Sequence, residues 1–158
     1  MKHVEQLKRA SVAQLLFKTS RLLNEQAIAL ARERLNLPDL RTAHTTLFPH
    51  IDFEGTRLTE LALRLGVSKQ AVGQLVNELV EMGAFERVPD PDDGRARLVR
   101  FARGKDAVVA GLEVLLEVEA ELRDRLGDAA IEVLHGTLVA LEAELLDRPM
   151  LPEDFGVS

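Results

Sequence analysis

Residues 58–83 read LTELALRLGVSKQAVGQLVNELVEMG, and this stretch decides the fold. Apolar residues recur at helical spacing on both sides of a central glycine, so each side predicts a helix with one buried face. The first face comprises Leu58, Leu61, Ala62 and Leu65, and the second comprises Val72, Leu75, Val76, Leu79 and Val80. Gly66 ends the first helix, the Ser68 hydroxyl caps the second, and Gly83 provides a C-terminal cap. Two amphipathic helices joined by a tight turn predict a helix-turn-helix.

The period of the sequence changes after this stretch. Residues 84–88, AFERV, and residues 97–101, RLVRF, are short and alternating, as strands are. Between them, residues 89–97 read PDPDDGRAR, which is rich in turn-forming Pro, Asp and Gly. A helix, a tight turn, a polar-faced helix and a basic hairpin follow in this order. The sequence therefore predicts a winged helix-turn-helix in a fold that is mainly α with a small β-hairpin.

Long helices are predicted on both sides of this region. Residues 1–37 contain no Gly or Pro, and we expect one helix that ends before Pro38. A shorter helix is expected over residues 39–48. A further helix should run from Gly104 to Leu126, followed by a last helix with a coiled-coil seam. The seam comprises Ile131, Leu134, Leu138, Leu141 and Leu145.

These helices have more apolar surface than one small helix-turn-helix can cover. This excess favours a homodimer, and the alternative is a bundle within one chain. We expect one continuous fold with a long-helix dimerisation region. Its parts are an N-terminal dimerisation helix (1–37), the winged helix-turn-helix region (38–103), C-terminal dimerisation helices (104–148) and a tail (149–158).

Composition and charge exclude several classes of protein. The net charge of the chain is −6. Residues 104–158 have a net charge of about −9, whereas residues 94–105 hold five basic groups and no acidic one. A local basic patch of this kind marks a nucleic-acid surface better than the total charge does. The chain has no Cys. It also lacks a nucleophile elbow, a phosphate-binding glycine loop, a pair of histidines at metal-ligand spacing, a membrane-spanning run and a secretory signal. We expect a cytoplasmic protein that is not an enzyme and has no cofactor or metal.

The polar face of the second helix is the candidate DNA-reading surface. It carries Gln70, Gly73, Gln74, Asn77 and Glu81, and its Gln and Asn amides can pair with adenine in the major groove. Ser68 and Lys69, at the start of the helix, suit contacts to phosphate. The alternative is an ordinary solvated helix face. The position of this face within a helix-turn-helix, directly before a basic hairpin, favours DNA binding.

The residues GVSKQAVGQLVNELVEMGAFERVPDPDDGRARLVRF resemble the DNA-binding core of the MarR family of transcriptional regulators. The similarity runs from Thr56 to Phe101, and the order of helices on both sides also fits. The wing signature of the family is an acidic residue, a spacer and an arginine, matched by Asp93, Gly94 and Arg95.

The resemblance implies a homodimer that binds a pseudo-palindromic site on double-stranded DNA, and we expect it to be a repressor. Each recognition helix would enter a major groove, and each Arg95 would enter a flanking minor groove. Asp93 is expected to hold the Arg95 guanidinium in place, while Arg97, at the base of the returning strand, is expected to meet phosphate. Many members bind a small, often aromatic, effector between their two regions.

The sequence departs from the family pattern in two places. The family often has Ser or Thr followed by Arg in the middle of the recognition helix, where this chain has Gly73 and Gln74. The wing commonly has two adjacent arginines after its aspartate, and here Gly94 stands at the first of them. Base preference is therefore not carried over, and the wing is expected to grip phosphate less firmly.

An effector crevice is predicted near the junction of the two regions. Its candidate residues are Phe17, Arg21, His44 and Phe48, and the alternative is that these are packing or surface groups. A rival function is a winged-helix adaptor that binds another protein and has lost specific DNA binding. The basic hairpin argues against this rival, whereas Gly73, Gln74, Gly94 and the acidic tail argue weakly for it.

Overall fold

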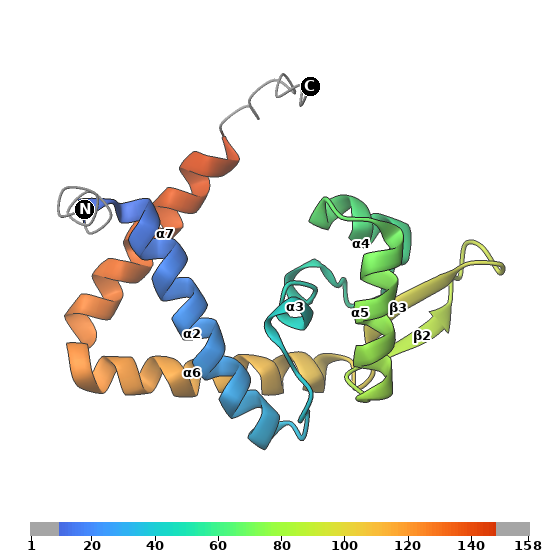
Figure 1. The fold of residues 1–158 in the computed structure, drawn as a ribbon, viewed down its shortest axis with the longest axis horizontal. Helices are drawn as coiled ribbons and strands as arrows, with labels where there is room; N and C mark the ends of the chain where they lie inside the picture. The colour runs from blue at the N-terminus through green and yellow to red at the C-terminus, as the bar shows by residue number, and fades with distance from the viewer. Residues whose placement is uncertain (1–9, 148–158) are drawn as a thin grey trace, which may run out of the picture. The chain divides into compact units, whose positions relative to one another are not determined.

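A computed structural model describes residues 10–147 of the chain. The chain divides into two compact units, the first ending at Val118 and the second beginning at Glu119. The first unit contains the winged helix-turn-helix and helix α2 (Figure 1). Among the described helices, none is long and apolar enough to cross a membrane.

The N-terminal helices are shorter than the sequence predicted. Helix α2 spans Val12–Arg34, whereas the predicted helix reached the residue before Pro38; residues 1–9 of that prediction lie outside the described residues. The helix ends early because Asn36 adopts a left-handed backbone with φ of 54°. The predicted helix over residues 39–48 is replaced by a single turn, α3 (Thr42–Thr45), and a 3₁₀ turn, η1 (Phe48–His50). Pro49 fits near the start of η1, where no backbone N–H is required.

The helix-turn-helix has the predicted form. Helix α4 spans Leu58–Leu65 and helix α5 spans Lys69–Glu81. Gly66 ends α4 in the left-handed conformation, with φ of 64°, which a glycine adopts without steric cost. The Ser68 hydroxyl then accepts the backbone N–H of Ala71 at 3.2 Å, so it caps α5 as expected.

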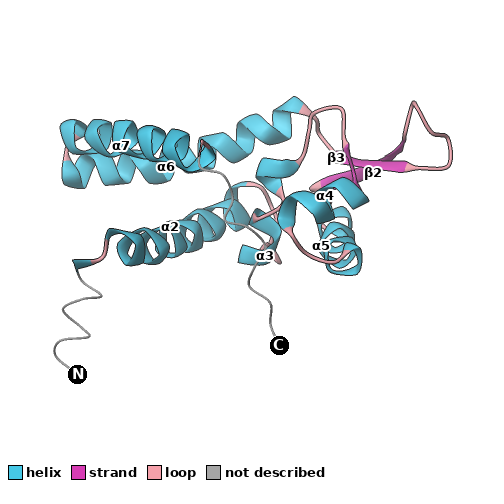
Figure 2. Ribbon diagram, turned by 90° about the horizontal axis from the view of Figure 1, so that it is seen from above, coloured by secondary structure: helices cyan, strands magenta, loops and turns pink. Residues whose placement is uncertain are grey.

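The wing is part of a three-stranded antiparallel sheet. Its strands are β1 (Thr56–Arg57), β2 (Phe85–Pro89) and β3 (Arg97–Phe101), in the order β1-β3-β2. The hairpin of β2 and β3 was predicted, but β1 was not. Strand β1 approaches β3 closely because position 55 is a glycine: a Cβ there would lie 2.8 Å from the Cβ of Leu98. The loop between β2 and β3 extends beyond the α4–α5 pair (Figure 2).

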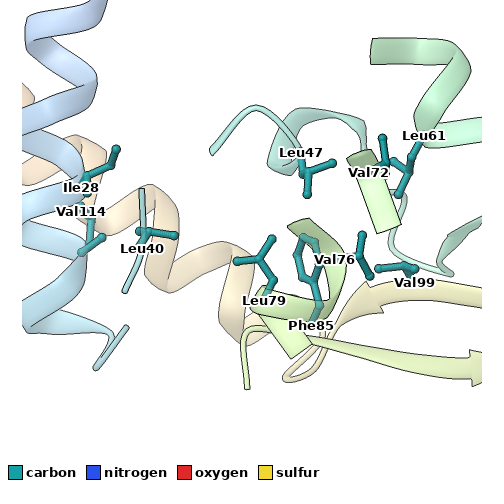
Figure 3. Packing of buried hydrophobic residues seen from close by; sticks show 11 residues of the cluster. Ile28, Leu40, Leu47, Leu61, Val72, Val76, Leu79, Phe85, Val99 and Val114 are labelled. Atoms are coloured by element: carbon teal, nitrogen blue, oxygen red, sulfur yellow. The ribbon is translucent and has the colours of Figure 1, made fainter. Parts of the chain in front are cut away.

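One apolar core holds the first unit together. Its buried members come from α2, the segments on either side of α3, α4, α5, β2, β3 and α6, and most of them are labelled in Figure 3. Leu47, Leu61, Val72, Val76 and Leu79 are fully buried. The rings of Phe48, Phe85 and Phe101 meet one another with centroid separations of 5.2 to 6.0 Å. Both predicted apolar faces of the helix-turn-helix therefore point into this core, which leaves the polar face of α5 outside.

Helix α6 spans Lys105–Leu126 and helix α7 spans Asp128–Leu146. Within the first unit, the Arg34 guanidinium donates to Glu117 at 2.6 Å, which ties α2 to α6. Within the second unit, Gly127 breaks the helix with φ of 86°, as the sequence predicted. On α7, Ile131 is buried, whereas the other four seam residues are exposed. An exposed apolar seam is unusual for a surface that faces only water.

Candidate nucleic-acid interface

The exposed face of α5 carries most of the residues predicted to read DNA. Lys69, Gln70, Gln74 and Asn77 are exposed along this helix, and Ser68 is exposed at its cap. Gly73 is half-buried instead, and a Cβ at this position would lie 3.6 Å from the side chain of Leu58.

That distance is an ordinary van der Waals contact, so space does not require glycine there. Gly73 therefore lies at the edge of the polar face, next to α4. The polar face has its exposed amides at positions 70, 74 and 77, which helical geometry places on one side of α5.

A hydrogen-bonded cluster connects α5 to the segment before and within α3. Oε2 of Glu78 accepts from Nη2 of Arg41 at 2.6 Å and lies 2.7 Å from Nε2 of His44. Oε1 of Glu78 accepts from Nε2 of Gln74 at 3.2 Å. The Arg41 guanidinium, and next the His44 ring, lower the pKa of Glu78 to about 2. Glu78 is therefore a carboxylate at neutral pH, with an acceptor oxygen on each side.

This cluster changes the interpretation of His44, which the sequence suggested as a crevice residue. His44 is 1% exposed, and its Nδ1 accepts the backbone N–H of Arg41 at 3.2 Å. Because Nδ1 accepts, Nε2 carries the proton and donates it to Glu78. Both ring nitrogens are thus used inside the protein. No pattern in the sequence predicts this cluster, because Glu78 is separated from His44 by 34 residues and the two meet only in the folded chain.

The wing loop is held by two aspartates with different partners. Asp90 is 5% exposed, accepts from Nε of Arg57 at 2.6 Å, and accepts the backbone N–H of Asp92 at 2.9 Å. These hydrogen bonds lower the pKa of Asp90, the one from Asp92 most strongly. Asp93 accepts the backbone N–H of Arg95 at 3.1 Å.

Asp93 therefore holds the backbone of the loop. Within the described residues it makes no ion pair with the Arg95 guanidinium. A carboxylate that accepts the N–H two residues ahead is a common device of tight turns. Gly94 has no atom within 4 Å of the place where a Cβ would stand, and its φ lies outside the left-handed region. The glycine at this position is therefore not demanded by the geometry of the loop.

Basic side chains from three elements line one open cavity of about 450 Å³. The cavity lies between the start of α4, the start of α5 and the hairpin. Its basic residues are Arg57, Lys69, Arg87, Arg95 and Arg97, and its other residues are Leu58, Thr59, Ala96 and Val99.

Of these five cations, Arg57 is paired with Asp90. Within residues 10–147, the remaining four have no ion pair. Four unpaired cations beside the positive N-terminal end of a helix create a site for an extended polyanion. The predicted phosphate and groove contacts Lys69, Arg95 and Arg97 are thus brought to one surface, while Arg87 and Arg57 were not predicted.

A second, apolar cavity of about 110 Å³ lies beside the aromatic cluster of the first unit. Of the four predicted crevice residues, Phe48 lines this cavity and the others do not. Phe17 is exposed on α2, and Arg21 pairs with Glu25 on the same helix. The lining comprises Ala31, Leu35, Leu37, Leu40, Phe48, Gly83, Ala84, Phe101, Arg103, Ala107 and Ala110. Arg103 is its single charged residue, and the sequence alone did not single it out.

Comparison with known proteins gives a consistent result. Residues 41–96 match the model of the MarR family. A crystal structure of MarR is 21% identical, with a TM-score of 0.65 over 84% of this chain and 98% of that one. A protein from Mycobacterium tuberculosis is 23% identical, with a TM-score of 0.64 over 89% and 95% of the two chains.

A transcriptional regulator from Thermotoga maritima is 25% identical, with a TM-score of 0.53 over 84% of this chain and 94% of that one. No curated protein sequence matches this chain. These similarities extend over the flanking helices as well as over the winged helix-turn-helix.

Proposed function

We propose that this chain is a homodimeric repressor of the MarR family that binds DNA sequence-specifically, as its match to the model of that family over residues 41–96 and its fold support. The observation that carries the proposal is the cavity formed by the start of α5 and the wing, lined by five basic side chains. This surface is basic although the chain as a whole has a net charge of −6.

The recognition helix supplies the proposed sequence readout. Gln70, Gln74 and Asn77 are exposed on one side of α5 and can each donate and accept hydrogen bonds at base edges in the major groove. Lys69 and the backbone at Ser68 would contact phosphate at the rim of this groove. Gly73, at the edge of the face, contributes space rather than a contact.

The wing supplies the proposed second contact. Arg95 is exposed near the tip of a loop whose backbone is held by Asp93 and Asp90. A minor groove that is narrow and rich in A·T pairs has an enhanced negative potential, which attracts an arginine presented in this way. Arg97 lines the basic cavity from the start of β3, where it would meet the phosphate backbone.

Exposed apolar side chains support the proposed homodimer. They lie on α2, on α6 and on α7, the three long helices outside the winged region. They include Val12, Leu15, Phe17, Leu22, Leu23, Val109, Leu112, Leu115, Leu116, Leu126, Leu134, Leu138, Leu141 and Leu145. A second copy of the chain would remove this surface from water. A two-fold dimer would in turn read a pseudo-palindromic site.

The apolar cavity is the proposed effector site. It is lined by Phe48 and Phe101 together with aliphatic residues, and Arg103 is the one charge that could anchor an anionic group. A small aromatic carboxylate matches this lining. Its binding would act on DNA affinity through α5, because Gly83 and Ala84, which follow the C-cap of this helix, also line the cavity.

A gel shift with the DNA upstream of the protein's own gene tests the proposed function. We expect a specific complex that survives competition by unrelated DNA and weakens steeply between about 50 and 200 mM salt. A protein–protein adaptor with this fold would give no specific complex at either salt concentration.

A further inference from the structure

Three amide side chains are exposed on the recognition helix. Within the described residues, the amide of Gln74 makes a hydrogen bond to another side chain. Its Nε2 donates to Oε1 of Glu78, one turn further along α5. Glu78 is itself held through its other oxygen by Arg41 and His44. The amide of Gln74 is therefore the outer end of a chain of hydrogen bonds that begins at a buried histidine.

We infer that Arg41, His44 and Glu78 position the Gln74 amide so that it reads adenine in the major groove. This inference rests on the proposed DNA binding and adds to it a specific base and three positioning residues. None of the three needs to touch DNA. They act through Gln74: Glu78 lies on α5 itself, whereas Arg41 and His44 precede Glu78 by 37 and 34 residues in the chain.

The orientation of the amide follows from the chemistry of its partner. An ionised carboxylate only accepts hydrogen bonds, so the nitrogen of Gln74 and not its oxygen must face Glu78. The amide nitrogen has two hydrogens, and one of them is used on Glu78. The second hydrogen and Oε1 remain, which form one donor beside one acceptor. Adenine presents the matching pair, the N7 acceptor beside the N6 donor.

Glu78 is suited to this role because it has two acceptor oxygens. Oε2 serves Arg41 and His44, while Oε1 serves Gln74. A glutamine at position 78 would keep the size of the side chain but only one of the acceptors. Its oxygen would be drawn to the charged Arg41 and to His44, and its nitrogen would then face the nitrogen of Gln74. Two donors repel each other, so the Gln74 amide would turn over or detach.

The test compares Glu78→Gln with Glu81→Gln. Glu81 is on the same helix, is exposed, and has no hydrogen bond among the described contacts. Both variants remove one negative charge from α5, so both raise non-specific DNA affinity to a similar degree. Binding-site selection is carried out with the wild type, with each variant and with Gln74→Ala, which identifies the base pair that Gln74 reads.

Gln74→Ala should lose its base preference at one base pair of the site. The wild type is expected to select adenine at that base pair. In Glu78→Gln, the preference for adenine at this position should fall about tenfold, within the range that one bidentate contact contributes. Glu81→Gln should keep the wild-type preference. Arg41→Met, which retains the aliphatic stem, should lower the preference less than Glu78→Gln does, because His44 still holds the carboxylate.

A measurement without DNA separates this inference from the proposed function. The side-chain amide signals of Gln74 in the NMR spectrum should move in Glu78→Gln and stay in place in Glu81→Gln. If the wild type selects a motif but Glu78→Gln leaves both the adenine preference and the Gln74 signals unchanged, the inference is wrong and the proposed function stands. If the wild type selects no motif, the proposed function and the reading of adenine both fail.

Discussion

Arg95 is the residue for which the proposed DNA contact is most specific. Replacing it with alanine should weaken binding to the selected site by about 1–3 kcal/mol for each half-site, the scale of one specific contact. The fold and the dimer should be unchanged, because Arg95 is exposed and its backbone N–H, not its side chain, is bonded to Asp93. Fluorescence anisotropy with the selected duplex measures the loss.

The matched control for this variant is Arg100→Ala. Arg100 also lies on the hairpin, but it pairs with Glu86 and does not line the basic cavity. Its replacement should change affinity much less than that of Arg95. Wild-type affinity in Arg95→Ala, or equal losses in the two variants, would show that the wing does not present Arg95 to DNA.

The wing loop has room for an arginine at position 94, the residue that the family resemblance implies there. No atom lies within 4 Å of the position that a Cβ would occupy. Gly94→Arg should therefore fold normally and strengthen DNA binding. With one added phosphate contact per subunit, the logarithmic salt dependence of a dimer should become steeper by about 1.8. Affinity titrations at several salt concentrations check this, with Gly94→Ala as the control for the loss of glycine.

The residue-scale predictions from sequence succeeded where the signal was local. Ser68 was identified as a cap because a hydroxyl before an apolar-periodic run has one common use, and the structure confirms its bond to Ala71. Asp93 was expected to hold the Arg95 guanidinium, whereas it accepts a hydrogen bond from the backbone N–H of Arg95. The partners of His44 and Glu78 could not be predicted, because they are set by how α3 is placed against α5.

At the scale of elements, the link between α3 and α5 should respond to acid. The folded protein holds the pKa of Glu78 at about 2, below its ordinary value of 4.5. The link therefore stabilises the fold fully above about pH 4.5, and this stabilisation is lost as the pH falls towards about 2. Urea unfolding from about pH 6 to about pH 2.5 tests this.

The wild type should be more stable than Glu78→Gln at the higher pH, and the difference in free energy of unfolding should shrink on acidification. Other carboxylates with lowered pKa values, such as Asp52 and Asp90, titrate equally in both proteins and cancel in the comparison. A difference that stays constant over this pH range would mean that the Glu78 carboxylate is not bonded in the folded protein.

Element types were more predictable than element ends. Apolar periodicity identified α4, α5, α6 and α7, and the glycines at 66, 83 and 127 marked their boundaries. The early end of α2 at Arg34 was missed because Asn36, which breaks the helix, is not a strong breaker in sequence. Strand β1 was missed because two residues carry no period and pair only with a distant strand.

At the scale of the whole molecule, a charged residue placed in the exposed seam on α7 should break the proposed dimer. Leu138→Glu would place a charge in a surface that a second copy is proposed to cover, and an unpaired buried charge is costly. Analytical ultracentrifugation should give twice the chain mass of 17.5 kDa for the wild type and the single mass for the variant. DNA affinity should fall with the loss of the second half-site.

Val133→Glu is the control for this variant. Val133 is 71% exposed on α7 but lies outside the seam, so the same substitution there should leave the dimer intact. A wild-type protein with the single chain mass would instead favour a bundle within one chain, the alternative that the sequence left open.

The central claim is that this chain reads a specific DNA sequence as a dimer, and binding-site selection from random duplex DNA tests it most directly. We expect a pseudo-palindromic motif with half-sites about 10 base pairs apart, because two recognition helices related by a two-fold axis enter successive major grooves. The selected duplex should also bind at least about a thousandfold more tightly than random DNA at physiological salt. Failure to enrich any motif, or equal affinity for the enriched and random duplexes, would contradict the claim and favour a protein–protein adaptor.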